Sequence, residues 1–192
     1  MTLRELLIQR AARLQEWHAL TAPEWGALRY PAFRNRVEGL ALGLMAGAPP
    51  VGSPLGPPLS PGPGPWGWAA EVACASCGLV WQPGAPGPDP ELLGGPRFND
   101  EGGRQAYHDR EHDVTEATPF SAGLDHGEML RRLRRLNGTL GWDHRTVLTL
   151  PLDQAATPAG RAALWSALYG GSHAVLGAGV WDPAPFEAFW SE

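Results

Sequence analysis

The stretch of sequence that decides our interpretation of the fold runs from Trp68 to Trp81 and reads WAAEVACASCGLVW. Val72 precedes Cys74, and Val80 follows Cys77. Valine is a residue that favours β-strands. This pattern predicts two short strands joined by a Cys-turn-Cys. Gly78, directly after the second cysteine, suits such a turn because glycine tolerates a positive φ.

A second motif further along the chain reads His108-Asp-Arg-Glu-His112. On a helix this spacing puts both imidazoles on one face. Thiolates and imidazoles are ligands that zinc prefers, and four of them complete a tetrahedral site. The sequence therefore predicts a zinc site built from Cys74, Cys77, His108 and His112. The segment from Cys74 to Gly78 resembles the knuckle of zinc ribbons, and that resemblance implies a structural metal.

Other interpretations of these cysteine and histidine residues remain open. The segment from His108 to His112 also fits the HxxEH pattern of inverted zinc peptidases, in which the glutamate activates water. An open site of two cysteines, one histidine and a water would instead make the chain a small metal-dependent hydrolase or transferase, with Glu111 or Glu116 as the base. Alternatively, the cysteines are small buried residues and the histidines lie on a solvated face. The chain would then be an accessory protein without a metal.

The charge pattern bears on the choice of partner. The formal net charge is −5, and every one of the 15 basic residues is arginine. A negative balance argues against general nucleic-acid binding, which usually needs an excess of positive charge. The densest basic cluster is Arg131, Arg132, Arg134 and Arg135, and we expect it to face solvent opposite a leucine stripe. The interpretation is a zinc-stabilised, non-enzymatic binding module whose arginine helix contacts nucleic acid or an acidic protein.

The remaining elements are predicted from local signals. Thr2 and Glu5 form a capping-box pattern at the start of a helix, and Thr157-Pro158 is typical of a helix start. Further helices are expected over Phe33 to Met45, over Asp100 to His112 and after Asp125, and a strand over 145–152. The segment 47–66 is rich in proline and glycine, which predicts a linker or long loop. It separates a helical segment, 1–46, from 67–192.

Together these patterns predict an α+β, mainly α protein. Helical N- and C-terminal parts flank a small β-type Cys knuckle. No apolar run approaches the length of roughly 18 residues that a membrane span needs. The first residues lack the pattern of a signal peptide. We therefore expect a cytoplasmic protein without a membrane partner.

Overall fold

The computed structural model describes residues 1–58, 64–88, 101–177 and 179–191. Its helices are α1 (Leu3–Arg13), α2 (Tyr30–Met45), α3 (Pro65–Ser76), α4 (Glu101–Asp113), α5 (His126–Leu140) and α6 (Pro158–Gly170), with short 3-10 turns at Leu152–Gln154 and Ala184–Phe186. Its strands are β1 (His18–Ala22), β2 (Gly26–Arg29), β3 (Pro54–Leu55), β4 (Val80–Trp81), β5 (Pro119–Ser121), β6 (Leu124–Asp125), β7 (Val147–Pro151) and β8 (His173–Gly177). None of the helices in these ranges is long and apolar enough to cross a membrane.

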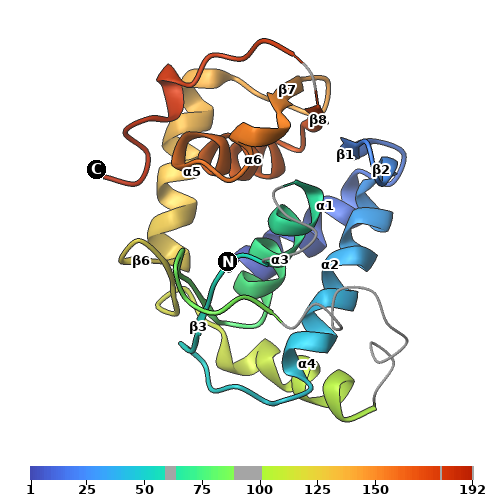
Figure 1. Ribbon diagram of the computed structural model, residues 1–192, viewed down its shortest axis with the longest axis vertical. Coiled ribbons are helices and arrows are strands. Elements are labelled where there is room, and N and C mark those ends of the chain that lie inside the picture. The colour runs from blue at the N-terminus through green and yellow to red at the C-terminus, as the bar shows by residue number, and fades with distance from the viewer. Residues whose placement is uncertain (59–63, 89–100, 178, 192) are drawn as a thin grey trace.

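The strands form two mixed sheets, and helices connect the parallel strands (Figure 1). The first sheet has the order β2-β1-β8-β7, in which β7 and β8 run parallel from Val147 opposite His173 to Pro151 opposite Gly177. The second sheet has the order β3-β4-β5-β6, with β3, β4 and β5 parallel. Parallel neighbours need a crossover connection, which is usually a helix. Here α6 joins β7 to β8, α3 joins β3 to β4, and α4 joins β4 to β5.

This architecture corrects the predicted fold class. The chain is an α/β protein with two four-stranded sheets, and not a mainly helical protein around a β-type Cys knuckle. The cysteines lie in α3 and at its end, where two strands were predicted on either side of them. The segment of α3 is apolar on all sides and rich in alanine, which is typical of a buried helix. Of the two predicted strands, only the second exists, as β4, and Gly78 before it does have a positive φ of 68°.

Several local predictions are confirmed. The Thr2 hydroxyl accepts from the Glu5 N–H and the Glu5 carboxylate accepts from the Thr2 N–H, which completes the capping box of α1. Asp125 caps α5, and Thr157 caps α6 with Pro158 at its first position. The strand expected over 145–152 is β7. Within the predicted loop 47–66, the structure places β3 and the start of α3, while 59–63 lie outside the described residues.

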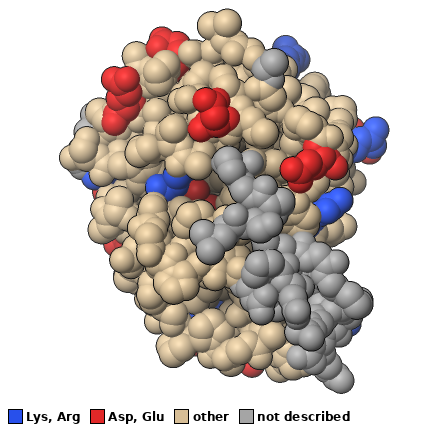
Figure 2. All heavy atoms as spheres, in the orientation of Figure 1, with Lys and Arg blue, Asp and Glu red and all other residues tan. Residues whose placement is uncertain are grey.

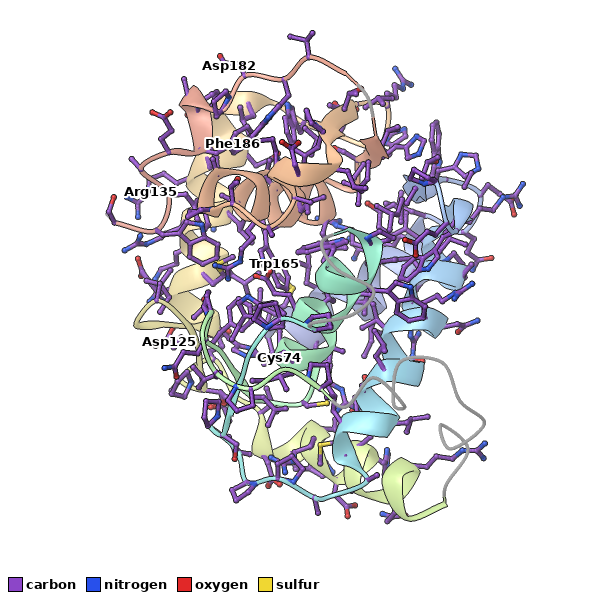
Figure 3. The ribbon with its side chains drawn as sticks, viewed as in Figure 1. Cys74, Asp125, Arg135, Trp165, Asp182 and Phe186 are labelled. Atoms are coloured by element: carbon purple, nitrogen blue, oxygen red, sulfur yellow. The ribbon has the colours of Figure 1, made fainter. Side chains whose placement is uncertain are left out.

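The core is one cluster of buried side chains that includes residues before position 46 and after position 67. Helix α3 packs against α1 and α2, and α6 packs against α5 and β8. Trp165 of α6 lies in the middle of the molecule (Figure 3), where it contacts Trp68 and Phe120 edge to face with ring centroids 5.0 and 5.3 Å apart. Residues that are distant in sequence therefore meet around Trp165.

The start of α1 also meets the start of α5 at a buried histidine. His126 is fully buried, and its Nδ1 accepts from the Leu3 backbone N–H at 3.2 Å. The proton of the neutral ring is therefore on Nε2, which has no hydrogen-bond partner in the described part of the chain. Burial lowers the pKa of His126 to about 4. The ring is neutral at physiological pH.

Candidate functional site

A buried ion pair joins the two central helices. Glu71 of α3 and Arg161 of α6 form two hydrogen bonds, from Nε to Oε2 at 2.9 Å and from Nη2 to Oε1 at 2.8 Å. Their side chains are 3% and 9% exposed. Each is the only charged residue of its helix. Charged side chains are almost never this buried unless they are paired, so each residue accounts for the position of the other.

Neighbouring side chains hold both partners of the pair. The Trp165 indole N–H donates to Oε1 of Glu71 at 2.8 Å. Arg161 Nη2 also donates to the Ser121 hydroxyl at 3.0 Å, and that hydroxyl donates to the Trp81 carbonyl at 3.2 Å. The Glu71 carboxylate thus accepts three hydrogen bonds from α6. It is fixed in place and cannot rotate away without leaving buried donors unpaired.

One nitrogen of Arg161 remains available. Its Nη1 has no hydrogen-bond partner among the described residues, and Arg161 lines two cavities. The Trp190 ring lies over the guanidinium, with its centroid 4.4 Å from Cζ, and Trp190 donates to the Pro158 carbonyl at 2.8 Å. The pair therefore presents a single unused donor in otherwise apolar surroundings.

Two cavities meet at Arg161. The first has a volume of about 290 Å³, and we call it the tryptophan cavity. Its walls are apolar apart from the ion pair, and they comprise Pro57, Pro58, Gly64, Gly67, Trp68, Trp81, Pro83, Ala155 and Ala156, with Glu71 and Arg161. The second cavity, of about 420 Å³, shares Trp81, Pro83 and Arg161 with the first and extends to Trp190. Concave apolar sites with a few convergent polar groups are typical of small-molecule binding.

The predicted zinc ligands are not brought together. Cys74 and Cys77 are fully buried in the core, and the Cys77 thiol contacts the Ala41 carbonyl at 3.7 Å. Burial raises the pKa of both thiols, that of Cys77 to about 12. His108 and His112 are exposed on α4. Within the described ranges, no group of three or more His, Cys, Asp or Glu residues could hold a metal ion. The interpretation as a zinc-stabilised binding module is therefore wrong.

The arginine cluster on α5 is also not the solvent-facing patch that we expected. Arg131 is exposed and pairs with Glu128. Arg132 is buried, and it bonds Glu128 at 3.2 Å and the Phe189 carbonyl at 2.6 Å. Arg134 and Arg135 are exposed, and Figure 3 shows Arg135 at the outer edge of the molecule. On the face in Figure 2 the charged residues are scattered. The structure gives no support to a nucleic-acid or acidic-protein partner.

The proteins that are similar to this chain were found among solved structures. No family profile and no curated protein sequence matches the chain. The N-terminal subdomain of Klebsiella oxytoca NpsA in complex with anthranilyl-AMSN superimposes with a TM-score of 0.65 at 16% identity, over 94% of this chain and 54% of that one. The fused adenylation–PCP di-domain NpsA-ThdA gives 0.66 and 16%, over 95% and 40%. The N-terminal domain of Mycobacterium tuberculosis FACL13 gives 0.63 and 15%, over 95% and 58%.

The chain has the fold of an adenylation-domain N-terminal subdomain. It spans about half the length of the structures it matches, and at this level of identity the likeness shows the adenylation-type fold alone. The ion pair of Glu71 and Arg161 in this chain was not predicted from the sequence, although a lone charge in each of two apolar helices was a usable signal. The sequence analysis also missed Gly62-Pro-Gly-Pro-Trp-Gly67, which has the spacing G-x-G-x-x-G, and the last three residues of this segment open α3.

Proposed function

We propose that the chain binds a small aromatic molecule in the tryptophan cavity. The observation that carries this proposal is the combination of an apolar wall with one unused donor, Nη1 of Arg161. Trp68 and Trp81 line the cavity, and contacts between aromatic rings add to the gain from burial. A solved structure of similar fold, that of the NpsA subdomain, contains an anthranilyl compound, which supports an aromatic ligand.

The size of the cavity restricts the ligand. Small-molecule sites usually measure roughly 300–1,000 Å³, and the volume of about 290 Å³ lies at the lower end of that range. A single substituted ring suits this space better than a fused polycyclic system or a long acyl chain. The hydrogen-bonding substituent of the ring would point at Arg161.

Adenylate formation is a second candidate, favoured by the names of the similar structures. This reaction joins a carboxylate to the AMP part of ATP and releases pyrophosphate, so the enzyme must hold the nucleotide phosphates. Backbone N–H groups of glycine-rich loops commonly do this. The segment 62–67 has the required glycine spacing, but Pro63 and Pro65 have no N–H to offer, and the sequence has no lysine. We therefore place ligand binding first.

Isothermal titration with single-ring amides and acids tests the first proposal. We expect Ala156→Phe to abolish binding, because Ala156 lines the cavity and is itself exposed, so the larger side chain fills the space without disturbing the core. Ala27→Phe, at an exposed position of β2, is the matched control and should bind as the wild type does. Binding that persists in Ala156→Phe would place the ligand elsewhere. Release of pyrophosphate from ATP and an aromatic acid would instead support the second candidate.

A further inference from the structure

We infer that the ligand of the tryptophan cavity presents a neutral acceptor, such as a carboxamide, ester or thioester carbonyl, and not an ionised carboxylate. This inference rests on the proposed function and narrows it to a chemical class. It follows from the charges around the cavity, from the hydrogen bonds that fix Glu71, and from the one donor left on Arg161. Each of these observations is independent of the similarity to adenylation-type structures.

The charges that line the cavity already cancel. Among the described residues that line it, Glu71 and Arg161 are the only charged ones, and they neutralise each other through two hydrogen bonds. In the second cavity, Arg161 is the one charged residue among the walls that the structure describes. A ligand carboxylate would therefore add one uncompensated negative charge to an apolar space, close to the carboxylate of Glu71. Burying an unpaired charge is strongly unfavourable, whereas a neutral carbonyl that accepts a hydrogen bond is not.

A ligand carboxylate also cannot take the place of Glu71. Three donors hold that side chain, two from Arg161 and one from the indole of Trp165. The carboxylate of Glu71 is 3% exposed, so its displacement would leave a buried anion without partners. The cost of such an unpaired buried charge exceeds what a new pair with the ligand returns.

The remaining donor matches a carbonyl oxygen. Nε and Nη2 of Arg161 are engaged by Glu71, and Nη2 also by Ser121. This leaves Nη1, and one of its N–H groups can donate to a carbonyl oxygen of the ligand. Because Nη1 lies beside apolar walls, a hydrogen bond formed there is shielded from water and gains strength.

Matched ligand pairs test the inference on the wild-type protein. Benzamide and benzoate have nearly the same shape, as do anthranilamide and anthranilate, so a difference in affinity within a pair reports charge. At pH 7.5 we expect each amide to bind at least about tenfold more tightly than its acid, a difference of about 1.4 kcal/mol. An acid that binds as tightly as its amide, or more tightly, overturns the inference while leaving the proposed function intact. If none of the four binds, the proposed function fails, and the inference fails with it.

Two further measurements separate charge from shape. Glu71→Gln removes the negative charge and keeps an amide oxygen that can accept from Trp165, so it should reverse the preference toward the acids. An unchanged preference in this variant contradicts the inference. In the wild type, between pH 7 and pH 5.5, the apparent affinity for benzoate should rise about tenfold per pH unit, because only its neutral form binds, while that for benzamide stays constant. A flat benzoate profile also contradicts the inference.

Discussion

The stability of the protein should fall when the pH is lowered from 7 to 5, and His126 should account for the effect. This ring is fully buried where the start of α1 meets the start of α5, and its Nδ1 accepts from the Leu3 N–H. Protonation would add a second proton to the ring, at Nδ1. This would break the hydrogen bond from the Leu3 N–H and leave a buried positive charge. Burial lowers the pKa of His126 to about 4, and the negative charge of Asp125 offsets only part of this effect.

The direction and the size of the effect follow from the two pKa values. In the unfolded chain a histidine titrates near pH 6.5, so the unfolded state takes up the proton first as the pH falls, and unfolding becomes more favourable. The stabilisation is complete above pH 6.5 and is lost as the pH falls toward 4. A shift of about 2.5 units corresponds to about 3.4 kcal/mol in total, of which about 2 kcal/mol is lost between pH 7 and pH 5.

Urea unfolding followed by tryptophan fluorescence at pH 7, 6 and 5 measures this loss in the free energy of unfolding. His126→Asn keeps an acceptor near the Leu3 N–H and cannot be protonated in this range, so it should remove about 2 kcal/mol of pH dependence. His112→Asn changes an exposed histidine of α4 and serves as the control, with the pH dependence of the wild type. If His126→Asn loses as much stability on acidification as the wild type does, the reasoning is refuted.

Further substitutions test buried polar side chains and the predicted zinc ligands. Glu71→Leu should lower the free energy of unfolding by about 3–5 kcal/mol, because it leaves Arg161 buried and unpaired, and a double variant with Arg161→Leu should recover much of the loss. Urea unfolding of the wild type and these two variants tests this, and equal stability of the single variant and the wild type would contradict it. Cys77→Ser should cost about 1–3 kcal/mol through a buried hydroxyl, whereas His112→Ala should leave the melting temperature unchanged. Elemental mass spectrometry should find the same zinc content in both variants as in the wild type, and a joint loss of zinc would restore the shared site. Arg132→Ala should cost about 1.5–3 kcal/mol and increase protease cleavage near the C-terminal segment, because its bond to the Phe189 carbonyl is lost; unchanged cleavage would argue against that role.

The helix starts could be predicted from the sequence because their determinants are local. The Thr2 and Glu5 side chains bond backbone groups within one helical turn, and so does Thr157. The sheets could not be predicted in the same way. Strands β3 and β4 have two residues each, too few for an alternating pattern, and they pair with partners far away in the chain. No short stretch of the sequence therefore indicates the strand pairing that defines the α/β class.

The candidate site was missed for a related reason. In α3 the sequence motif drew attention to Cys74 and Cys77, although their neighbour Glu71 is the residue with an unusual physical situation. An acidic residue in a helix that is otherwise apolar predicts a buried partner, but it does not say where in the chain that partner lies. Arg161 is 90 residues away, and only the packing of α3 against the rest of the core brings the two together. A CxxC motif alone does not distinguish thiols that bind a metal from thiols that fill a core.

The position of Arg161 between the two cavities gives this one residue an architectural role. Its side chain lines both the cavity of about 290 Å³ and the cavity of about 420 Å³, as Trp81 and Pro83 also do. Replacing both members of the ion pair with small apolar residues should enlarge the space where the two cavities meet. The fold could then accommodate an extended two-ring guest instead of a single ring. Two positions in two helices would thus set the capacity of the site, and evolution or design could change that capacity without moving a single strand.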